Sequence, residues 1–220
     1  MKNIVGFMHI YTVNHYEEIV QSQVQQILDS GLVQFVDKVY YVVIGEEFEI
    51  ENSHFVLLEY NSDMSLHENY TLNRIRTIAK ASKKNFPIFY IHTKGVTKPK
   101  DKCLRDWRQY MEYYCIGKWL HCLDALNVAD TVGVSLRRYG KIRYHYSGNF
   151  WWANSSYIKQ LPELSEEGYG REVNRWDGEF WIGDGSPKMM QMHNSRVHHA
   201  TQQYPLRRYE NRLDMRLWGR

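Results

Sequence analysis

The first 92 residues alternate between short apolar runs and amphipathic stretches, and this pattern restricts the fold more than any other feature of the chain. The apolar runs have the length of buried strands, and the stretches between them repeat apolar residues with helical spacing. We expect strands at 3–10, 38–45, 54–60 and 87–92, and helices at 16–31 and 66–84. Strands separated by helices form parallel sheets with right-handed crossovers. The pattern therefore predicts an α/β fold with a mostly parallel central sheet flanked by helices.

The second half of the chain has a different pattern, with longer aromatic segments and shorter apolar runs. A helix is expected over 104–126, strands over 130–136 and 148–154, and a short helix over 155–161. The charged, Trp- and Gly-containing stretch 165–187 is expected to form the walls of a cleft. No repeat or low-complexity linker separates the two halves, so we expect one domain over residues 1–220.

Polar residues follow several predicted strands. In parallel α/β sheets, ligands bind beyond the carboxyl ends of the strands. The residues at that edge are His9, Tyr11, Gly45, Asn61 and the stretch 92–95, His-Thr-Lys-Gly. Lys94 offers a point charge for phosphate, His92 a hydrogen-bond donor or metal ligand, and Gly95 a close approach of backbone to ligand. A strand end whose histidine caps a carbonyl and whose glycine turns the chain explains the same residues equally well.

Aromatic residues make up 15% of the chain, with 17 Tyr and 7 Trp. Their flat faces and polar tips suit sugar rings and nucleobases, although most large rings simply fill cores. Trp151 and Trp152 are adjacent on a predicted strand, so they point to opposite faces, and we expect at most one of them to be fully in the core. The other could stack on a sugar, and Asn149 offers the donors and acceptors that a polyol needs. Core packing of both rings is the equal alternative.

Two carboxylates lie among tryptophans near residue 178. Asp177 and Glu179 share a face if the segment is a strand and diverge if it begins a helix. A desolvated carboxylate has a raised pKa and is a candidate general base. A surface ion pair with Arg175 is the alternative interpretation.

Composition argues against several classes of protein. The net charge of +3 is too small to indicate a nucleic-acid partner. No apolar run approaches the roughly 20 residues of a transmembrane helix, and the N-terminus does not have the pattern of a signal peptide. The three cysteines form no Cys-x-x-Cys pair, which argues against a zinc site or a disulfide framework and favours a reducing, cytoplasmic location.

Five segments occur in an order that resembles a known family. They are 68–72 (ENYTL), 89–95 (FYIHTKG), 107–111 (WRQYM), 147–153 (SGNFWWA) and 179–183 (EFWIG). Together they resemble GT-A-fold glycosyltransferases, in particular viral enzymes of the chlorella-virus capsid type and bacterial polysaccharide glycosyltransferases. The resemblance covers roughly residues 3–205, and the pair HTKG and SGNFWWA is its most specific part.

This resemblance implies a GT-A-like fold and a glycosyltransferase activity. The expected reaction transfers a hexose or deoxyhexose from a nucleotide-sugar donor, a UDP-sugar in the first instance, to a glycan or glycoprotein acceptor. Residues 1–100 would form the nucleotide-binding half and residues 101–220 the sugar- and acceptor-binding half. Inversion of the anomeric centre is favoured. The expected location is the cytoplasm, which would be that of the host for a viral protein.

The resemblance also assigns roles to individual residues. Nucleotide and diphosphate would contact His9, Tyr11, Glu68, Arg74, His92, Lys94, Gly95, Trp107 and Arg108. Glu68 and Arg74 would face the nucleotide or orient Lys94. Sugar and acceptor would contact Asn149, Trp151 and Trp152. Glu179, or failing it Asp177, occupies the place of the catalytic base.

One departure concerns the metal. Most GT-A enzymes carry an Asp-x-Asp motif that holds Mn²⁺ or Mg²⁺ on the diphosphate, whereas residues 92–94 here are His-Thr-Lys. Lys94 would repel a cation but could neutralise the diphosphate directly. If Mn²⁺ or Mg²⁺ binds, His92 is its expected ligand. The alternative to an enzyme is a non-catalytic module that binds carbohydrate or nucleotide-sugar.

Overall fold

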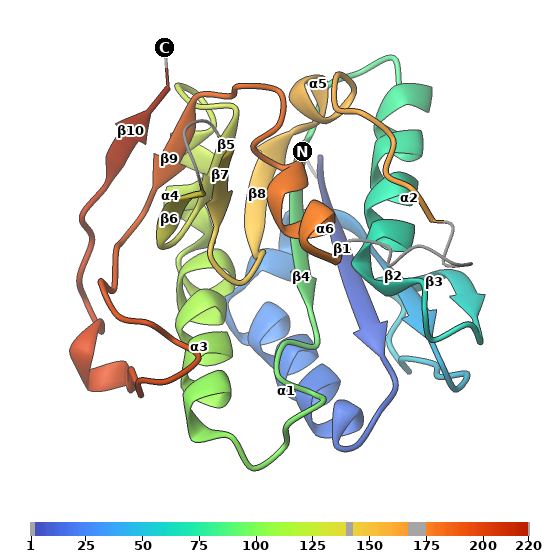
Figure 1. Ribbon diagram of the computed structural model, residues 1–220. Helices are drawn as coiled ribbons and strands as arrows, with labels where there is room; N and C mark the ends of the chain where they lie inside the picture. Colours follow the sequence, from blue (N-terminus) through green and yellow to red (C-terminus); the bar gives the residue numbers. More distant parts are fainter. Residues whose placement is uncertain (1–2, 140–142, 167–174, 220) are drawn as a thin grey trace.

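One eight-stranded sheet runs through both halves of the chain (Figure 1). The structure is a computed structural model that describes residues 3–139, 143–166 and 175–219. Part of the stretch expected to form cleft walls, residues 167–174, lies outside the described residues. Within the described ranges, no helix is long and apolar enough to cross a membrane.

The first half folds as its periodicity predicts. Its elements are β1 (Ile4–Tyr11), α1 (Tyr16–Asp29), β2 (Val36–Ile44), β3 (Phe55–Asn61), α2 (His67–Ala81) and β4 (Pro87–His92). Gly31, at a φ of 73°, follows the end of α1 in the left-handed conformation that glycine adopts without strain. The four predicted strands and two predicted helices of this half are therefore confirmed.

The second half is more broken than its pattern predicts. Its elements are α3 (Lys102–Glu112), a π-helical segment (Tyr113–Gly117), α4 (Trp119–Ala125), β5 (Thr131–Gly133), β6 (Leu136–Tyr139), β7 (Arg143–Tyr146), β8 (Trp151–Asn154), α5 (Ser155–Ile158), α6 (Arg175–Trp181), β9 (Met189–Gln191), a 3₁₀ helix (Leu206–Arg208) and β10 (Arg216–Trp218). The single helix expected over 104–126 is interrupted by the π-helical segment. Strands β6, β7, β9 and β10 are three or four residues long, too short to give a periodic signal.

The order of strands in the large sheet is β10-β9-β5-β8-β4-β1-β2-β3. Strands β3, β2, β1 and β4 are parallel neighbours, and β5 is parallel to β9. Strand β8 runs antiparallel between β4 and β5, and β10 runs antiparallel to β9. The sheet is therefore mixed, and the expectation of a mostly parallel sheet is wrong for the second half. The chain enters β8 from the hairpin of β6 and β7, which forms a separate two-stranded sheet.

Strand β1 is the point where the order of the sheet reverses. From β1 the chain passes to β2 and β3 on one side and then returns to β4 on the other. Figure 1 shows β1 and β4 side by side and pointing the same way. His9 and His92 are paired neighbours at the carboxyl ends of these strands. In open α/β sheets such a reversal opens a crevice in which ligands bind.

Both faces of the sheet are covered by helices. One core lies under α1, α3 and α4, and the other lies under α2, α5 and α6. Trp152 belongs to the first core and Trp151 to the second, and both side chains are 0% exposed. Two adjacent residues on a strand can both be fully buried when each face has its own core. The expectation that at most one of them is in the core is therefore wrong.

We predict that Trp152→Ala lowers the free energy of unfolding by about 3–5 kcal/mol, because it leaves a large cavity under the helices. Trp218→Ala is the matched control, since Trp218 lies on β10 with 43% of its surface exposed. Urea unfolding of the two variants checks this. Equal losses of stability would contradict the assignment of Trp152 to the core.

Candidate functional site

A cluster of polar side chains lies at the crevice between β1 and β4. His9 and His92 come from the ends of these two strands, Glu68 from the first turn of α2, and Asn149 from the turn before β8. Lys94 lies two residues after the end of β4. The structure thus brings together five of the residues that the sequence predicts.

Glu68 connects three separate elements. Its Oε2 accepts hydrogen bonds from the hydroxyl of Tyr90 at 2.9 Å and from Nδ2 of Asn149 at 2.7 Å. Its Oε1 lies 3.8 Å from Nδ1 of His92. Burial raises the pKa of Glu68, but His92, His9 and Lys94 together with the Tyr90 hydrogen bond outweigh it, and the pKa lies below its ordinary value. The carboxylate is therefore ionised at neutral pH.

The two histidines are buried and hydrogen bonded. Nε2 of His92 lies 2.8 Å from the carbonyl oxygen of Gly148, and a carbonyl can only accept, so Nε2 carries the hydrogen. Nδ1 of His9 lies 2.8 Å from the hydroxyl of Thr71. Burial lowers the pKa of His9 to about 4 and also lowers the pKa of His92, against the opposing effect of Glu68. Both rings are therefore neutral at neutral pH.

Lys94 faces a carboxylate and an aromatic ring. Its Nζ lies 3.6 Å from Oε1 of Glu179 and 4.4 Å from the centre of the Trp107 ring. The side chains of Lys94 and Glu179 are each 17% exposed. Gly95 follows at a φ of 84°, a conformation that favours glycine, and it turns the chain towards α3. An ammonium and a carboxylate thus meet at the edge of the sheet.

Asn149 is a structural member of the cluster. It is fully buried at a φ of 61°. Its Oδ1 accepts a hydrogen bond from Nε1 of Trp151 at 3.1 Å, while its Nδ2 donates to Glu68. Asn149, Trp151 and Trp152 are therefore packed in the interior below the site, and none of the three presents a solvent-exposed surface to a sugar. The prediction that they contact sugar and acceptor is not met by this geometry.

Asp177 and Glu179 lie on a helix, α6, which selects one of the two alternatives left open by the sequence. Residues two apart on a helix point in different directions. Glu179 faces Lys94, whereas Asp177 lies on a different side of α6. Between the two candidate bases, the geometry favours Glu179.

Three further residues predicted for the site, Arg74, Tyr11 and Arg108, make hydrogen bonds or ion pairs outside the Glu68 cluster. Nε of Arg74 lies 2.9 Å from Oε2 of Glu59, and its guanidinium also pairs with Glu166. The resemblance implies that Arg74 faces the nucleotide or orients Lys94, and these two ion pairs do not connect it to Lys94. The hydroxyl of Tyr11 donates to the carbonyl of Met64 at 3.2 Å, and its ring is partly exposed. Arg108 is buried and donates to the carbonyl of Lys94 at 2.9 Å.

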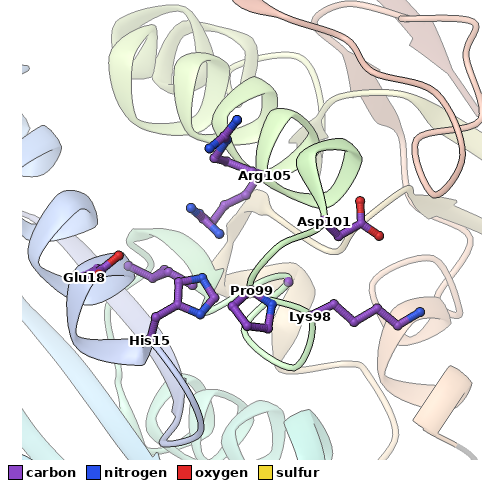
Figure 2. Close-up of a pocket in the computed structure, with 9 residues that line it drawn as sticks. His15, Glu18, Lys98, Pro99, Asp101 and Arg105 are labelled. Carbon is purple, nitrogen blue, oxygen red and sulfur yellow. The ribbon is translucent and has the colours of Figure 1, made fainter.

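A cavity of about 180 Å³ lies next to the turn that contains Gly95 (Figure 2). It opens between the start of α1 and the start of α3, and its lining includes His15, Glu18, Lys98, Pro99, Asp101 and Arg105. Of the predicted residues, Gly95 and Arg108 line it. Arg108 therefore faces this cavity, and its Nε lies 3.4 Å from Oε1 of Glu112.

Several functional neighbours were missed by sequence reasoning. Tyr90 is two residues before His92 on the same strand, so the two share a face, and their rings stack at 6.1 Å. Thr71 is three residues after Glu68 on α2, again on the same face. Thr93 accepts a hydrogen bond from the backbone N–H of Tyr11 at 3.1 Å and joins the ends of β1 and β4. The periods of strand and helix could have identified Tyr90 and Thr71.

The donor set does not fit a divalent cation. Among the described residues, no three His, Cys, Asp or Glu side chains are grouped so as to hold a metal. His92 has its Nε2 committed to Gly148, and Oε2 of Glu68 already accepts two hydrogen bonds. The ammonium of Lys94 adds repulsion. Hard cations prefer several oxygen ligands, which this cluster does not offer.

We predict that the free energy of unfolding falls as pH drops from 6.5 to about 4, partly because of His9. Its pKa is lowered from 6.5 to about 4, so in this window the unfolded chain binds more protons than the folded one. The loss attributable to this ring is about 3 kcal/mol. Urea unfolding across the window should show a shallower decline for His9→Asn than for wild type. His121→Asn, at an exposed position on α4, should keep the wild-type slope; equal slopes in all three proteins would contradict the prediction.

Comparison with known proteins places the chain in a family. No curated protein matches it. A family model described as "Domain of unknown function (DUF8361)" matches residues 7–213, which is nearly the whole chain. The protein therefore belongs to the DUF8361 family.

Proposed function

We propose that this protein is a GT-A-like glycosyltransferase that moves a sugar from a nucleotide-sugar, most simply a UDP-sugar, to a glycan or glycoprotein acceptor. The observation that carries the proposal is the pair formed by Lys94 and Glu179 at the sheet edge, 3.6 Å apart. Glycosyl transfer needs a positive charge beside the leaving diphosphate and a base beside the acceptor hydroxyl. The pair supplies both.

The position of the pair supports the same proposal. Lys94 follows β4 at the place where the strand order reverses, which is where α/β sheets bind nucleotides. The parallel strands β1 to β4 form the half that the resemblance assigns to the nucleotide. The motif pair HTKG and SGNFWWA meets here in space, since Nε2 of His92 donates to the carbonyl of Gly148.

The proposed reaction is a single displacement with inversion. The acceptor oxygen forms a bond to the anomeric carbon while the bond from that carbon to the diphosphate oxygen breaks. Glu179 accepts the proton of the acceptor hydroxyl, and Lys94 stabilises the negative charge that develops on the diphosphate. Trp107 restricts Lys94 by lying under its ammonium. Because the donor set does not fit Mn²⁺ or Mg²⁺, no step is assigned to a metal.

The proposed location is the cytoplasm. All three cysteines, Cys103, Cys115 and Cys122, are free thiols. Free thiols are typical of a reducing compartment.

We predict that Glu179→Gln lowers kcat by roughly 10²- to 10⁴-fold, because the acceptor loses its general base. Binding of UDP, followed by thermal shift, should stay within about twofold of wild type in this variant, whereas Lys94→Gln should weaken it. Exposed Glu210→Gln and Lys80→Gln are the charge-matched controls.

The assay is a screen of UDP-, GDP- and TDP-sugars for transfer and for hydrolysis, with and without Mn²⁺. If the wild-type protein used none of these donors, the proposal that it is a glycosyltransferase would be contradicted. UDP binding without turnover would instead support a non-catalytic nucleotide-sugar-binding module. A fully active Glu179→Gln variant would show that Glu179 is not the general base.

A further inference from the structure

The cavity next to Gly95 takes no part in the proposed transfer. Its walls come from the start of α1, from the turn between β4 and α3, and from α3 itself. Helices α1 and α3 pack in one core, whereas α6, which carries Glu179, packs in the core on the other face of the sheet. The volume of about 180 Å³ is far larger than the roughly 10–15 Å³ that one water needs. The cavity is therefore a separate space with room for a ligand.

Positive charge exceeds negative charge in the lining of this cavity. Among the described residues that form it, three are cationic, Lys98, Arg105 and Arg108, and two are acidic, Glu18 and Asp101. The carboxylate of Asp101 is already engaged, because its Oδ1 accepts two backbone N–H groups in the first turn of α3, at 2.9 and 3.2 Å. Glu18, at an exposed position on α1, is thus the lining carboxylate that opposes a bound anion.

Arg108 brings a buried cation with an unused donor to the cavity. The residue is only 9% exposed, and its Nη1 donates to the carbonyl of Lys94 at 2.9 Å. Its Nε lies 3.4 Å from Oε1 of Glu112, but within the described part of the chain this Nε has no hydrogen-bond partner. A guanidinium keeps its charge, and its fork of N–H donors matches the oxygens of a phosphate. A buried donor without an acceptor costs free energy, which an anion in the cavity would recover.

The start of α1 adds further donors from another side. Its N-cap, His15, makes no capping hydrogen bond, and the buried Nδ1 of this ring has no partner among the described residues. The N–H groups in the first turn of a helix lack intrahelical acceptors and carry the positive end of the helix dipole. Figure 2 shows His15 and Glu18 on α1, Arg105 on α3 and Pro99 on the turn between them. Donors therefore surround the cavity from two helices, an arrangement that binds anions.

The walls of the cavity are tied to one another. Nδ2 of Asn14, in the loop before α1, donates to the carbonyl of Val96 in the turn after β4, at 3.0 Å. Within that turn, the N–H of Lys98 donates to the carbonyl of Gly95, also at 3.0 Å. Arg108 joins α3 to the same turn through the carbonyl of Lys94. A site that is already held in shape loses little free energy to ordering when a ligand binds.

We propose that this cavity binds a phosphate group that is not part of the sugar donor. A phosphate carries a charge of about −1.5 to −2 and three strong acceptor oxygens, which the donors around the cavity can share. Arg105 and Arg108 bind it from α3, and the first-turn N–H groups bind it from α1. The resemblance gives Arg108 to the donor diphosphate; here it serves a second, separate phosphate. The site does not rest on the proposed function, because neither Lys94 nor Glu179 belongs to its lining.

The direct test is isothermal titration calorimetry with inorganic phosphate and with glycerol 3-phosphate, at constant ionic strength set with NaCl. Wild type should bind at least one of them saturably. Arg105→Gln should weaken that binding by roughly tenfold or more, because a charge-assisted hydrogen bond is lost. Glu18→Gln should tighten it by about two- to fivefold, because a like charge leaves the rim, and a variant that merely unfolds cannot do this. Lys102→Gln, which removes an exposed charge from α3 outside the lining, should stay within about twofold of wild type.

The UDP thermal shift separates this site from the donor site. It should be the same in Arg105→Gln as in wild type, whereas Lys94→Gln reduces it. Absence of saturable binding of either probe would overturn the proposal, as would wild-type affinity in both Arg105→Gln and Glu18→Gln. Loss of the UDP shift in Arg105→Gln would overturn the separation of the two phosphates. Phosphate binding that responds as expected, with no transfer from any nucleotide-sugar, would support the cavity and contradict only the glycosyltransferase.

Discussion

The carboxylate of Glu68 is the contact on which the rest of the site depends. A partly buried ionised group is costly unless it is hydrogen bonded, and here Tyr90 and Asn149 supply the bonds from two other elements. The position of Glu68 in the first turn of α2 adds the favourable field of the helix N-terminus. A single charge thereby fixes α2, β4 and the turn before β8 relative to one another, through Tyr90 and Asn149.

The same arrangement separates residues that build the site from residues that can act in it. Asn149 and the two tryptophans after it are buried, and they fix where the crevice is. Lys94 and Glu179 are partly exposed, and they face each other across it. A motif dense in aromatic residues can therefore mark a functional site through its packing, while the groups that touch a substrate come from less conspicuous sequence.

The parts of the fold and of the site that can be predicted from sequence are those that depend on local patterns and not on contacts between distant residues. The helices and strands of the first half were predicted because each is long enough to show its period, and the place of His92 and Lys94 followed from strand order. The direction of β8 could not be predicted, because four residues carry no information about which neighbour they pair with. The burial of both Trp151 and Trp152 depends on helices that are distant in sequence, and the approach of Glu179 to Lys94 depends on how α6 packs on α2.

Strand β8 has a consequence for how the protein acquires its site. It pairs with β4 at Phe89 and Trp152, positions separated by more than sixty residues, and it also completes the pairing of β5. Contacts of such long sequence separation form late, because much chain must be ordered before they are made. During synthesis, β1 to β4 can assemble first, before Asn149 is available to donate its hydrogen bond to Glu68. The growing chain therefore has a nearly complete parallel half with an open edge at β4, and the insertion of β8 both closes that edge and finishes the site.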